Sequence, residues 1–321
     1  MNRMVLIISL LAVLVGNVLG FGKFETKVIA SVAHSLLTPH SQEIIARIIG
    51  NDGVLPDVAQ CTDTLAERLP YTAAWHFVDI PLRGTGYLPD VHDKQENAVT
   101  VLRNYIKILR HSATMGEQKK EALTWIINLV GDLHQPLKVA EDNYQHGKKL
   151  VVHYRGSTFS LHDLWDFALV SSHYKTPKIL ISEMSYMMNE SDSMYYQNTT
   201  FLDWVNGTLR TAAGCYLVDG DTIGSSDINM IPPSYSTKSI LLIKNQIKLA
   251  SIRLAWLLNQ TLDSEPLFAP LKYNWSAEDD YYHGSICPMV SKIKPQNMKH
   301  SDIPPRHLNM HKACERSVRS F

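Results

Sequence analysis

The residues of this sequence that could do chemistry begin at residues 131–138, which read Gly-Asp-Leu-His-Gln-Pro-Leu-Lys. An apolar run over residues 125–130 leads into Asp132, and Pro136 stops a helix soon after it. An isolated acid in a protein interior is costly unless it is paired or bound to a metal. We therefore interpret Asp132 as a candidate metal ligand. The alternative is an acid satisfied by backbone amides or by an arginine.

A second group lies at residues 161–166, Leu-His-Asp-Leu-Trp-Asp. His162 and Asp166 are four residues apart, so a helix would place them on one face, as two ligands of one ion require. A surface ion pair or a helix cap is the simpler alternative. His76 lies in an apolar segment expected to be extended, residues 75–79, where a hydrogen-bonded core histidine is the alternative. The candidate ligands are Asp63, His76, Asp132, His134, His162 and Asp166.

Such a set of ligands suits the hydrolysis of phosphodiesters. Two cations a few ångströms apart polarise the phosphoryl oxygen, lower the pKa of a bridging water and stabilise the leaving oxygen. A carboxylate must bridge the two ions, and Asp132 is the best candidate for that role. Other histidines, among them His146, lack ligand spacing, and we interpret them as structural or solvated.

The elements expected to position these residues are almost all helices. Thr38 and Pro39 have the types of an N-cap and a first-turn proline, in a helix that ends at Gly50. The helix over residues 122–130 is apolar nearly all round, which predicts a central position. A loose alternation over residues 149–160 predicts a short β-hairpin. The other expected helices cover residues 28–37, 98–109, 162–170, 177–188, 200–213 and 238–259.

The chain is expected to have three parts. Residues 1–20 have the features of a secretory signal, with an apolar core too short to span a bilayer comfortably and a cut that leaves Phe21 first. Residues 21–262 form one predicted helical domain, and residues 263–321 are a weakly periodic extension rich in Pro, His, Lys and Ser. We expect a monomer in the secretory pathway, outside the cell or in a vacuolar or lysosomal lumen, with no transmembrane segment after cleavage.

Cysteines, sequons and charge agree with this route. The cysteines are even in number and widely spaced, which suits two long-range disulfides, the alternative being free buried thiols. They are Cys61, Cys215, Cys287 and Cys314. Asn-X-Ser/Thr sequons predict glycosylation at Asn189, Asn198, Asn206, Asn259 and Asn274. The 31 Lys and Arg residues balance 31 Asp and Glu residues, which excludes a grip on duplex DNA by charge alone but not a nucleic acid bound through a metal.

In the order and spacing of these motifs, the sequence resembles the S1/P1 nuclease family. The resemblance runs from Phe21 to about Asn259 and is carried by Asp63 and by residues 76–79, 131–137, 161–166 and 253–259. It implies secreted enzymes with three zinc ions that cut single-stranded nucleic acid and remove 3′-phosphates. It also implies an all-α fold with a short β-hairpin, shared with bacterial zinc-dependent phospholipase C. Single-stranded nucleic acid or nucleotides would be the partners.

The resemblance further implies three zinc sites, and each lacks one histidine here. The first would use Asp63, His76 and the bridging aspartate, but Asn128 stands where the family has a histidine. The second would use the backbone amine and carbonyl of Phe21 and the same aspartate, but Thr26 stands in place of a histidine. Amide and hydroxyl oxygens are weaker ligands for zinc than imidazole.

The third site would use His162 and Asp166, but Lys138 stands in place of its histidine. An ammonium group cannot bind zinc and repels it, so we expect Lys138 to fill the site and pair with Asp166. In the same region residues 146–148 read His-Gly-Lys where the family has Gly-Gly-Asn. The family resemblance is therefore an unsafe guide to activity.

The leading hypothesis is metal-dependent hydrolysis of phosphodiester bonds in single-stranded nucleic acid, as an endonuclease and 3′-nucleotidase. Asp63 and Asp132 would be the catalytic carboxylates, and Phe77 would stack a base, unless it is a core residue. The alternative is an inactive secreted relative that binds nucleotides, lipid head groups or a protein partner. It is motivated by ligand losses that are spread over all three sites. The shared fold also allows a phospholipase-like substrate.

Overall fold

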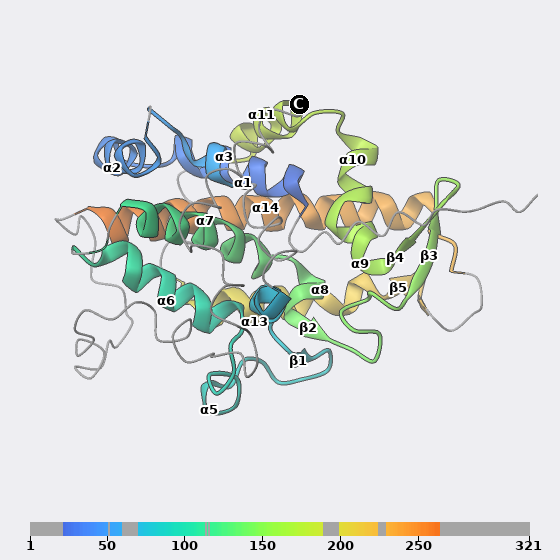
Figure 1. Cartoon of the computed structure of the whole chain (residues 1–321). Coiled ribbons are helices and arrows are strands. Elements are labelled where there is room, and N and C mark those ends of the chain that lie inside the picture. Colours follow the sequence, from blue (N-terminus) through green and yellow to red (C-terminus); the bar gives the residue numbers. More distant parts are fainter. Residues whose placement is uncertain are drawn as a thin grey trace, which may run out of the picture.

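The computed structural model describes residues 22–50, 52–59, 70–112, 114, 116–188, 199–223 and 229–263, and these are mostly helical (Figure 1). The strands in the described part of the chain form three separate two-stranded pairs. The expected all-α fold class with a short hairpin is thus confirmed. The expected signal peptide and most of the C-terminal extension lie outside the described residues.

The longest helix, α14 (Pro233–Leu262), runs along the domain and forms its axis (Figure 1). α1 (Lys23–Ser35) packs along α14, and α6 (Ala98–Arg110) packs against α7 (Gly116–Asp132). α7 contacts α1 and α14 as well, and residues 122–132 are all buried. Its predicted central position is confirmed.

Aromatic packing sets the depth of α7 in the domain. The ring of Trp125 stacks on Tyr105 of α6, with centroids 5.8 Å apart and planes 12° apart. Trp75 meets the same indole edge-on at 5.1 Å. These contacts hold the second half of α7 in the interior, so its last residue, Asp132, is buried too.

α2 (Pro39–Ile49) begins and ends as predicted. The hydroxyl of Thr38 accepts a hydrogen bond from the backbone amide three residues on, and the chain leaves the helix at Gly50 with φ of 85°. The same hydroxyl donates to the carboxylate of Asp263 at 3.0 Å. This contact ties the start of α2 to the end of α14.

His76 lies at the end of a 3-10 helix, η1 (Pro70–His76), and the expected extended segment was wrong at this residue. A strand would turn adjacent side chains to opposite faces, whereas the tight helical turn buries both Trp75 and His76. The chain then enters β1 (Ile80–Pro81), which pairs in parallel with β2 (Ala140–Glu141). This pairing brings the chain beyond His76 beside the chain beyond α7.

The expected hairpin is present as β3 (Val151–Tyr154) and β4 (Ser157–Ser160). Arg155 and Gly156 turn it, with φ of 49° and 80°, the left-handed values that a tight hairpin turn requires. The chain passes directly from β4 into the helix that carries His162.

That helix is not the regular helix expected over residues 162–170. It runs as α9 (Leu161–Asp163), a π-helical turn η2 (Leu164–Ala168) and α10 (Leu169–His173). The amide of Leu169 bonds to the carbonyl of Leu164, five residues back, which widens this turn. Such π turns are frequent at functional sites.

The remaining elements of the described residues are short helices, longer surface helices and one small strand pair. They are α3 (Leu55–Val58), α5 (Pro89–His92), α8 (Pro136–Val139), α11 (Pro177–Met187), α13 (Phe201–Cys215), β5 (Leu217–Val218) and β6 (Asp221–Thr222). In the part of the chain that the structure describes, we find no helix that is both long and apolar enough to cross a membrane.

Cys215, at the end of α13, is a free buried thiol. The expected disulfide is therefore absent at this residue, and the alternative of a free thiol holds. Its sulfur lies 3.9 Å from the carbonyl of Thr211 within the same helix, where it packs as a core residue. Cys61, Cys287 and Cys314 lie outside the described residues.

Two of the five sequons lie in the described residues, and both are in helices. Asn206 of α13 accepts a hydrogen bond from the amide of Tyr87 at 2.8 Å. Asn259 of α14 accepts one from the amide of Thr38 at 3.0 Å. Glycosylation there stays a prediction, and these contacts do not favour it. Asn189, Asn198 and Asn274 lie outside the described residues.

A buried hydrogen-bond chain at the start of α14 offers a test of this packing. The indole of Trp165 donates to the hydroxyl of Tyr235 at 2.7 Å, which in turn donates to the carbonyl of Cys215 at 2.6 Å. Tyr235→Phe leaves both partners buried and unsatisfied, so it should lower the free energy of unfolding by about 1–3 kcal/mol. Urea denaturation measures this, with Tyr186→Phe, whose side chain is 89% exposed, as the control. Equal stability of the two variants would contradict the packing described.

Candidate functional site

Five side chains that the sequence singled out converge in one buried cluster. His76 ends η1, Asp132 ends α7, Lys138 lies in α8, and His162 and Asp166 lie in α9 and η2. All five are at most 1% exposed. A backbone hydrogen bond of 2.8 Å from the amide of Val78 to the carbonyl of Lys138 holds two of these segments together.

Asp132 lies between two nitrogen donors, and each of its oxygens is engaged. The ammonium of Lys138 lies 3.0 Å from Oδ1, and Nδ1 of His76 lies 2.8 Å from Oδ2. Burial alone would raise the pKa of Asp132, but the Lys138 charge and the His76 ring outweigh it and hold that pKa below its usual value. The Asp132 carboxylate is therefore ionised and neutralised within the protein.

The expected partner of Lys138 was wrong, because the ammonium pairs with Asp132 and not with Asp166. Gln135 explains the difference. Its amide oxygen caps α8 by accepting the backbone amide of Lys138 at 3.2 Å, and its amide nitrogen donates to Oδ1 of Asp166 at 2.7 Å. Gln135 thus occupies one oxygen of Asp166 and binds the backbone of Lys138.

His162 and Asp166 form the other half of the cluster, as their spacing predicts. Nδ1 of His162 donates to the carbonyl of His146 at 2.9 Å, so Nε2 faces Oδ2 of Asp166, 3.1 Å away. Neither of these two atoms has a hydrogen-bond partner among the described residues. A lone pair that faces a carboxylate is repelled unless a proton or a metal ion lies between them.

His134 is not a metal ligand in this arrangement. Its Nδ1 donates to the carbonyl of Val130 at 2.7 Å, and its Nε2 accepts from a guanidinium nitrogen of Arg253 at 2.7 Å. Burial and the Arg253 charge hold the pKa of His134 well below its usual value. Both ring nitrogens are occupied, so the expectation for this residue was wrong.

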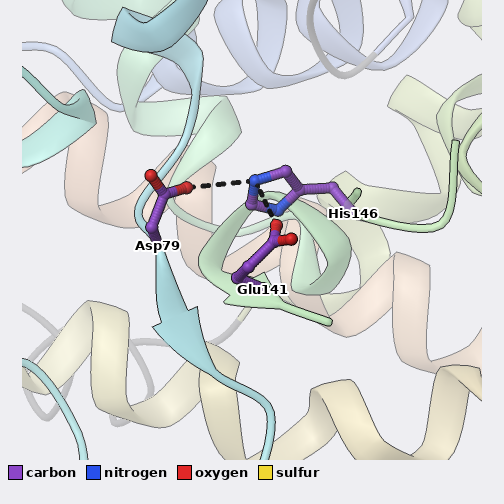
Figure 2. A group of neighbouring side chains, drawn as sticks. All are labelled: Asp79, Glu141 and His146. Atoms are coloured by element: carbon purple, nitrogen blue, oxygen red, sulfur yellow. Dashed lines mark hydrogen bonds and ion pairs between the residues drawn. The ribbon is translucent and has the colours of Figure 1, made fainter. Parts of the chain in front are cut away.

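A second group, outside the buried cluster, was missed by the sequence analysis. Nε2 of His146 lies 3.1 Å from Oδ1 of Asp79 and 2.8 Å from Oε2 of Glu141 (Figure 2). The hydrogen bond from His146 lowers the pKa of Asp79, whereas burial raises that of Glu141. We call these three residues the outer triad. His146 was interpreted as structural or solvated because no spacing in the sequence reveals a ligand set drawn from three segments.

Phe77 lies between the buried cluster and the outer triad. Its ring centroid is 4.4 Å from that of His146 and 5.8 Å from that of His162. The Lys148 ammonium lies 4.3 Å from the same ring. Phe77 is only 7% exposed, so a base could stack on it only after a neighbouring side chain moves.

Comparison with known proteins decides the family. A family model described as S1/P1 Nuclease matches residues 21–263. The chain belongs to the S1/P1 nuclease family. It is 28% identical over 156 residues to Nuclease S1 of Aspergillus oryzae, covering 46% of this chain and 53% of that protein. It is 24% identical over 184 residues to Endonuclease 4 of Arabidopsis thaliana, covering 53% of this chain and 62% of that protein. The matches thus span little more than half the length of these curated relatives.

As a member of the S1/P1 family, the chain differs at the positions implied for zinc. The amide nitrogen of Asn128 donates to the carbonyls of Ala59 and Thr124, at 3.1 and 3.0 Å, and so fastens α7 to the end of α3. Thr26 is buried in α1. Phe21 and Asp63 lie outside the described residues.

Glu25, next to Thr26, is a further buried acid that the sequence analysis passed over. It is fully buried, and neither carboxylate oxygen has a hydrogen-bond partner among the described residues. Burial, with a smaller contribution from the charge of Asp166, raises its pKa well above the usual value. Its place on the apolar stripe of α1, three residues before Val28, is the signal that could have revealed it.

The described residues do not fit the family's three-zinc arrangement. Both oxygens of Asp132 are engaged, and Lys138 places a positive charge where a bridged cation would need that carboxylate. The His162–Asp166 half does fit a single ion, because Nε2 and Oδ2 face each other without hydrogen-bond donors from the described residues. Nε2 of His76 is a further buried ring nitrogen without a hydrogen-bond partner among the described residues.

The Lys138–Asp132 pair can be tested by charge removal. Lys138→Met leaves Asp132 buried without its main counter-charge, so it should lower the free energy of unfolding by about 3–5 kcal/mol in urea denaturation. Adding Asp132→Asn removes the second charge and should restore most of that loss. The control is Lys178→Met, an exposed lysine of α11. A double variant no more stable than Lys138→Met would contradict the pairing.

Proposed function

We propose that this protein acts on single-stranded nucleic acid as a metal-dependent phosphodiester hydrolase with fewer metal ions than the family's three-zinc centre. The observation that carries the proposal is the His162–Asp166 pair, which keeps two ligand atoms 3.1 Å apart and without hydrogen-bond partners among the described residues. Family membership and the names of the curated relatives, a nuclease and endonucleases, support the reaction class.

Each residue has a distinct part in this proposal. His162 and Asp166 would hold the ion, which when bound would polarise a phosphoryl oxygen and activate water. The carbonyl of His146 fixes the orientation of the His162 ring, and Gln135 fixes that of Asp166. Lys148 is exposed next to Phe77, and its ammonium would attract the phosphate of an approaching strand.

The same proposal places the protein in the secretory route, outside the cell or in the lumen of a vacuole or lysosome. The apolar segment within residues 1–20 supports this location. Zinc is the proposed metal, because imidazole with carboxylate is a ligand set that it accepts.

A second candidate function is the binding of nucleotides without hydrolysis. The Lys138–Asp132 distance of 3.0 Å favours it, since the Lys138 ammonium here neutralises the carboxylate that bridges metal ions in the family. The Phe77 and Lys148 side chains would then bind a base and a phosphate without a reaction. Lipid head groups or a protein partner are weaker alternatives, because no contact in the described residues favours them.

Cleavage and binding of a fluorescent single-stranded DNA distinguish the two functions. The full secreted chain should cleave it with zinc and not with a chelator. His162→Ala removes a ligand and should lower the cleavage rate at least about 100-fold, a larger loss than orienting groups usually cause. His40→Ala, an exposed histidine of α2, is the control and should match the parent.

Fluorescence anisotropy on the same samples measures binding. Binding without cleavage by the parent protein would refute hydrolysis and support the second candidate. A parent protein that neither binds nor cleaves the DNA would refute both functions.

A further inference from the structure

The outer triad is assembled by the pairing of two short strands. Asp79 immediately precedes β1 and Glu141 lies in β2, and the register places Pro81 opposite Glu141. His146 reaches the same point from the loop before β3, and the three side chains converge in Figure 2. One nitrogen and two oxygens, each from a different segment, thus lie within 4.8 Å of one another.

The ring of His146 is held in the orientation of a metal ligand. Its Nδ1 lies 2.9 Å from the carbonyl of Leu137 and 3.1 Å from that of Ala140, and carbonyls only accept, so Nδ1 carries the hydrogen. Nε2 is therefore the atom that faces Asp79 and Glu141. Metal-binding histidines almost always use the second ring nitrogen in this way.

His134 is a histidine of the same protein whose second ring nitrogen has a hydrogen-bond donor as its partner. Its Nδ1 also donates to a carbonyl, but its Nε2 accepts a hydrogen bond from Arg253. A guanidinium group therefore satisfies that lone pair. Nε2 of His146 instead faces two carboxylates. A cation is the chemical complement of this environment.

The backbone of His146 lies in the left-handed region. Its φ is +58°, between Gln145 at +53° and Gly147 at +79°. This left-handed region is costly for most residues with a side chain and is freely used by glycine. The family resemblance places a glycine at this position. A histidine here thus adopts a backbone conformation that glycine takes up without strain.

We propose that Asp79, Glu141 and His146 bind a zinc-class divalent metal ion, separate from the buried cluster. Ligands about 2.0–2.1 Å from a tetrahedral zinc lie roughly 3.3 Å from each other. The two nitrogen–oxygen separations, 2.8 and 3.1 Å, reach that value with small outward shifts, and the Asp79 and Glu141 oxygens lie within 4.8 Å of each other. The Asp79 side chain is 66% exposed, so solvent can supply the fourth ligand. Imidazole favours zinc over magnesium or calcium.

A metal at the outer triad would change the charge next to Phe77. The two carboxylates present a negative edge, which repels phosphate. A bound divalent ion cancels that charge. The site would then favour the approach of an anionic ligand from the side of the Phe77 ring that faces His146.

Zinc titration of the full secreted chain by calorimetry tests the site, with Co²⁺ absorption as a second readout of the ligands. His146→Gly should weaken zinc binding at one site at least about 100-fold and remove the corresponding Co²⁺ bands. His162→Ala should leave that site intact, which separates it from the buried cluster. His146→Gly also removes the ring that packs against Phe77, so its fold is checked by circular dichroism in chelator before zinc is added.

Unchanged zinc stoichiometry and affinity in His146→Gly would overturn the proposal and leave the outer triad as an ion pair with a protonated histidine. Zinc binding that is lost only in His162→Ala would also overturn the proposal. If zinc binding at this site is lost in His146→Gly and kept in His162→Ala, the result supports the outer triad. This holds whether or not the protein cleaves nucleic acid.

Discussion

The carboxylate of Asp132 is buried at the end of the central helix α7, and the neighbouring segments are arranged around its charge. A buried carboxylate needs a counter-charge and hydrogen-bond donors to remain ionised. Lys138 and His76 supply both, at 3.0 and 2.8 Å. The lysine side chain is itself completely buried, so its whole length is packed to deliver one charge. In the S1/P1 family as the resemblance describes it, metal ions perform this task.

Three histidines of this protein share one orientation and meet two kinds of partner. In His134, His146 and His162, Nδ1 donates to a backbone carbonyl, which leaves Nε2 as the atom that meets the next partner. Arg253 donates to Nε2 in His134, whereas carboxylates face it in the other two. A neutral histidine beside a donor is a structural residue. A neutral histidine beside carboxylates is complete only with a proton or a metal ion.

Much of the fold and the convergence of the buried cluster could be predicted, because both depend on local patterns. The cap at Thr38 and the central position of α7 follow from residue types over a single helix. The pairing of Lys138 with Asp132 could not be predicted, and neither could the hydrogen bond by which Gln135 holds an oxygen of Asp166. Side-chain orientation of this kind is set by tertiary packing and leaves no periodic signal.

Two other features were hidden for related reasons. The outer triad depends on the parallel pairing of two strands of two residues each, too short to be visible as patterns. The π turn after His162 arises from a single hydrogen bond that spans five residues, which periodicity does not distinguish from an ordinary helix. The fold is therefore the securely predictable part, and the assignment of charges to partners requires the structure.

Anomalous diffraction at the zinc absorption edge, from crystals of the full chain grown with zinc, tests the central claim most directly. The claim is that Lys138 and not a metal neutralises Asp132. We predict anomalous density at the outer triad and beside the His162–Asp166 pair, and none within bonding distance of Asp132. Zinc bound to Asp132, with the Lys138 side chain turned away, would contradict the account.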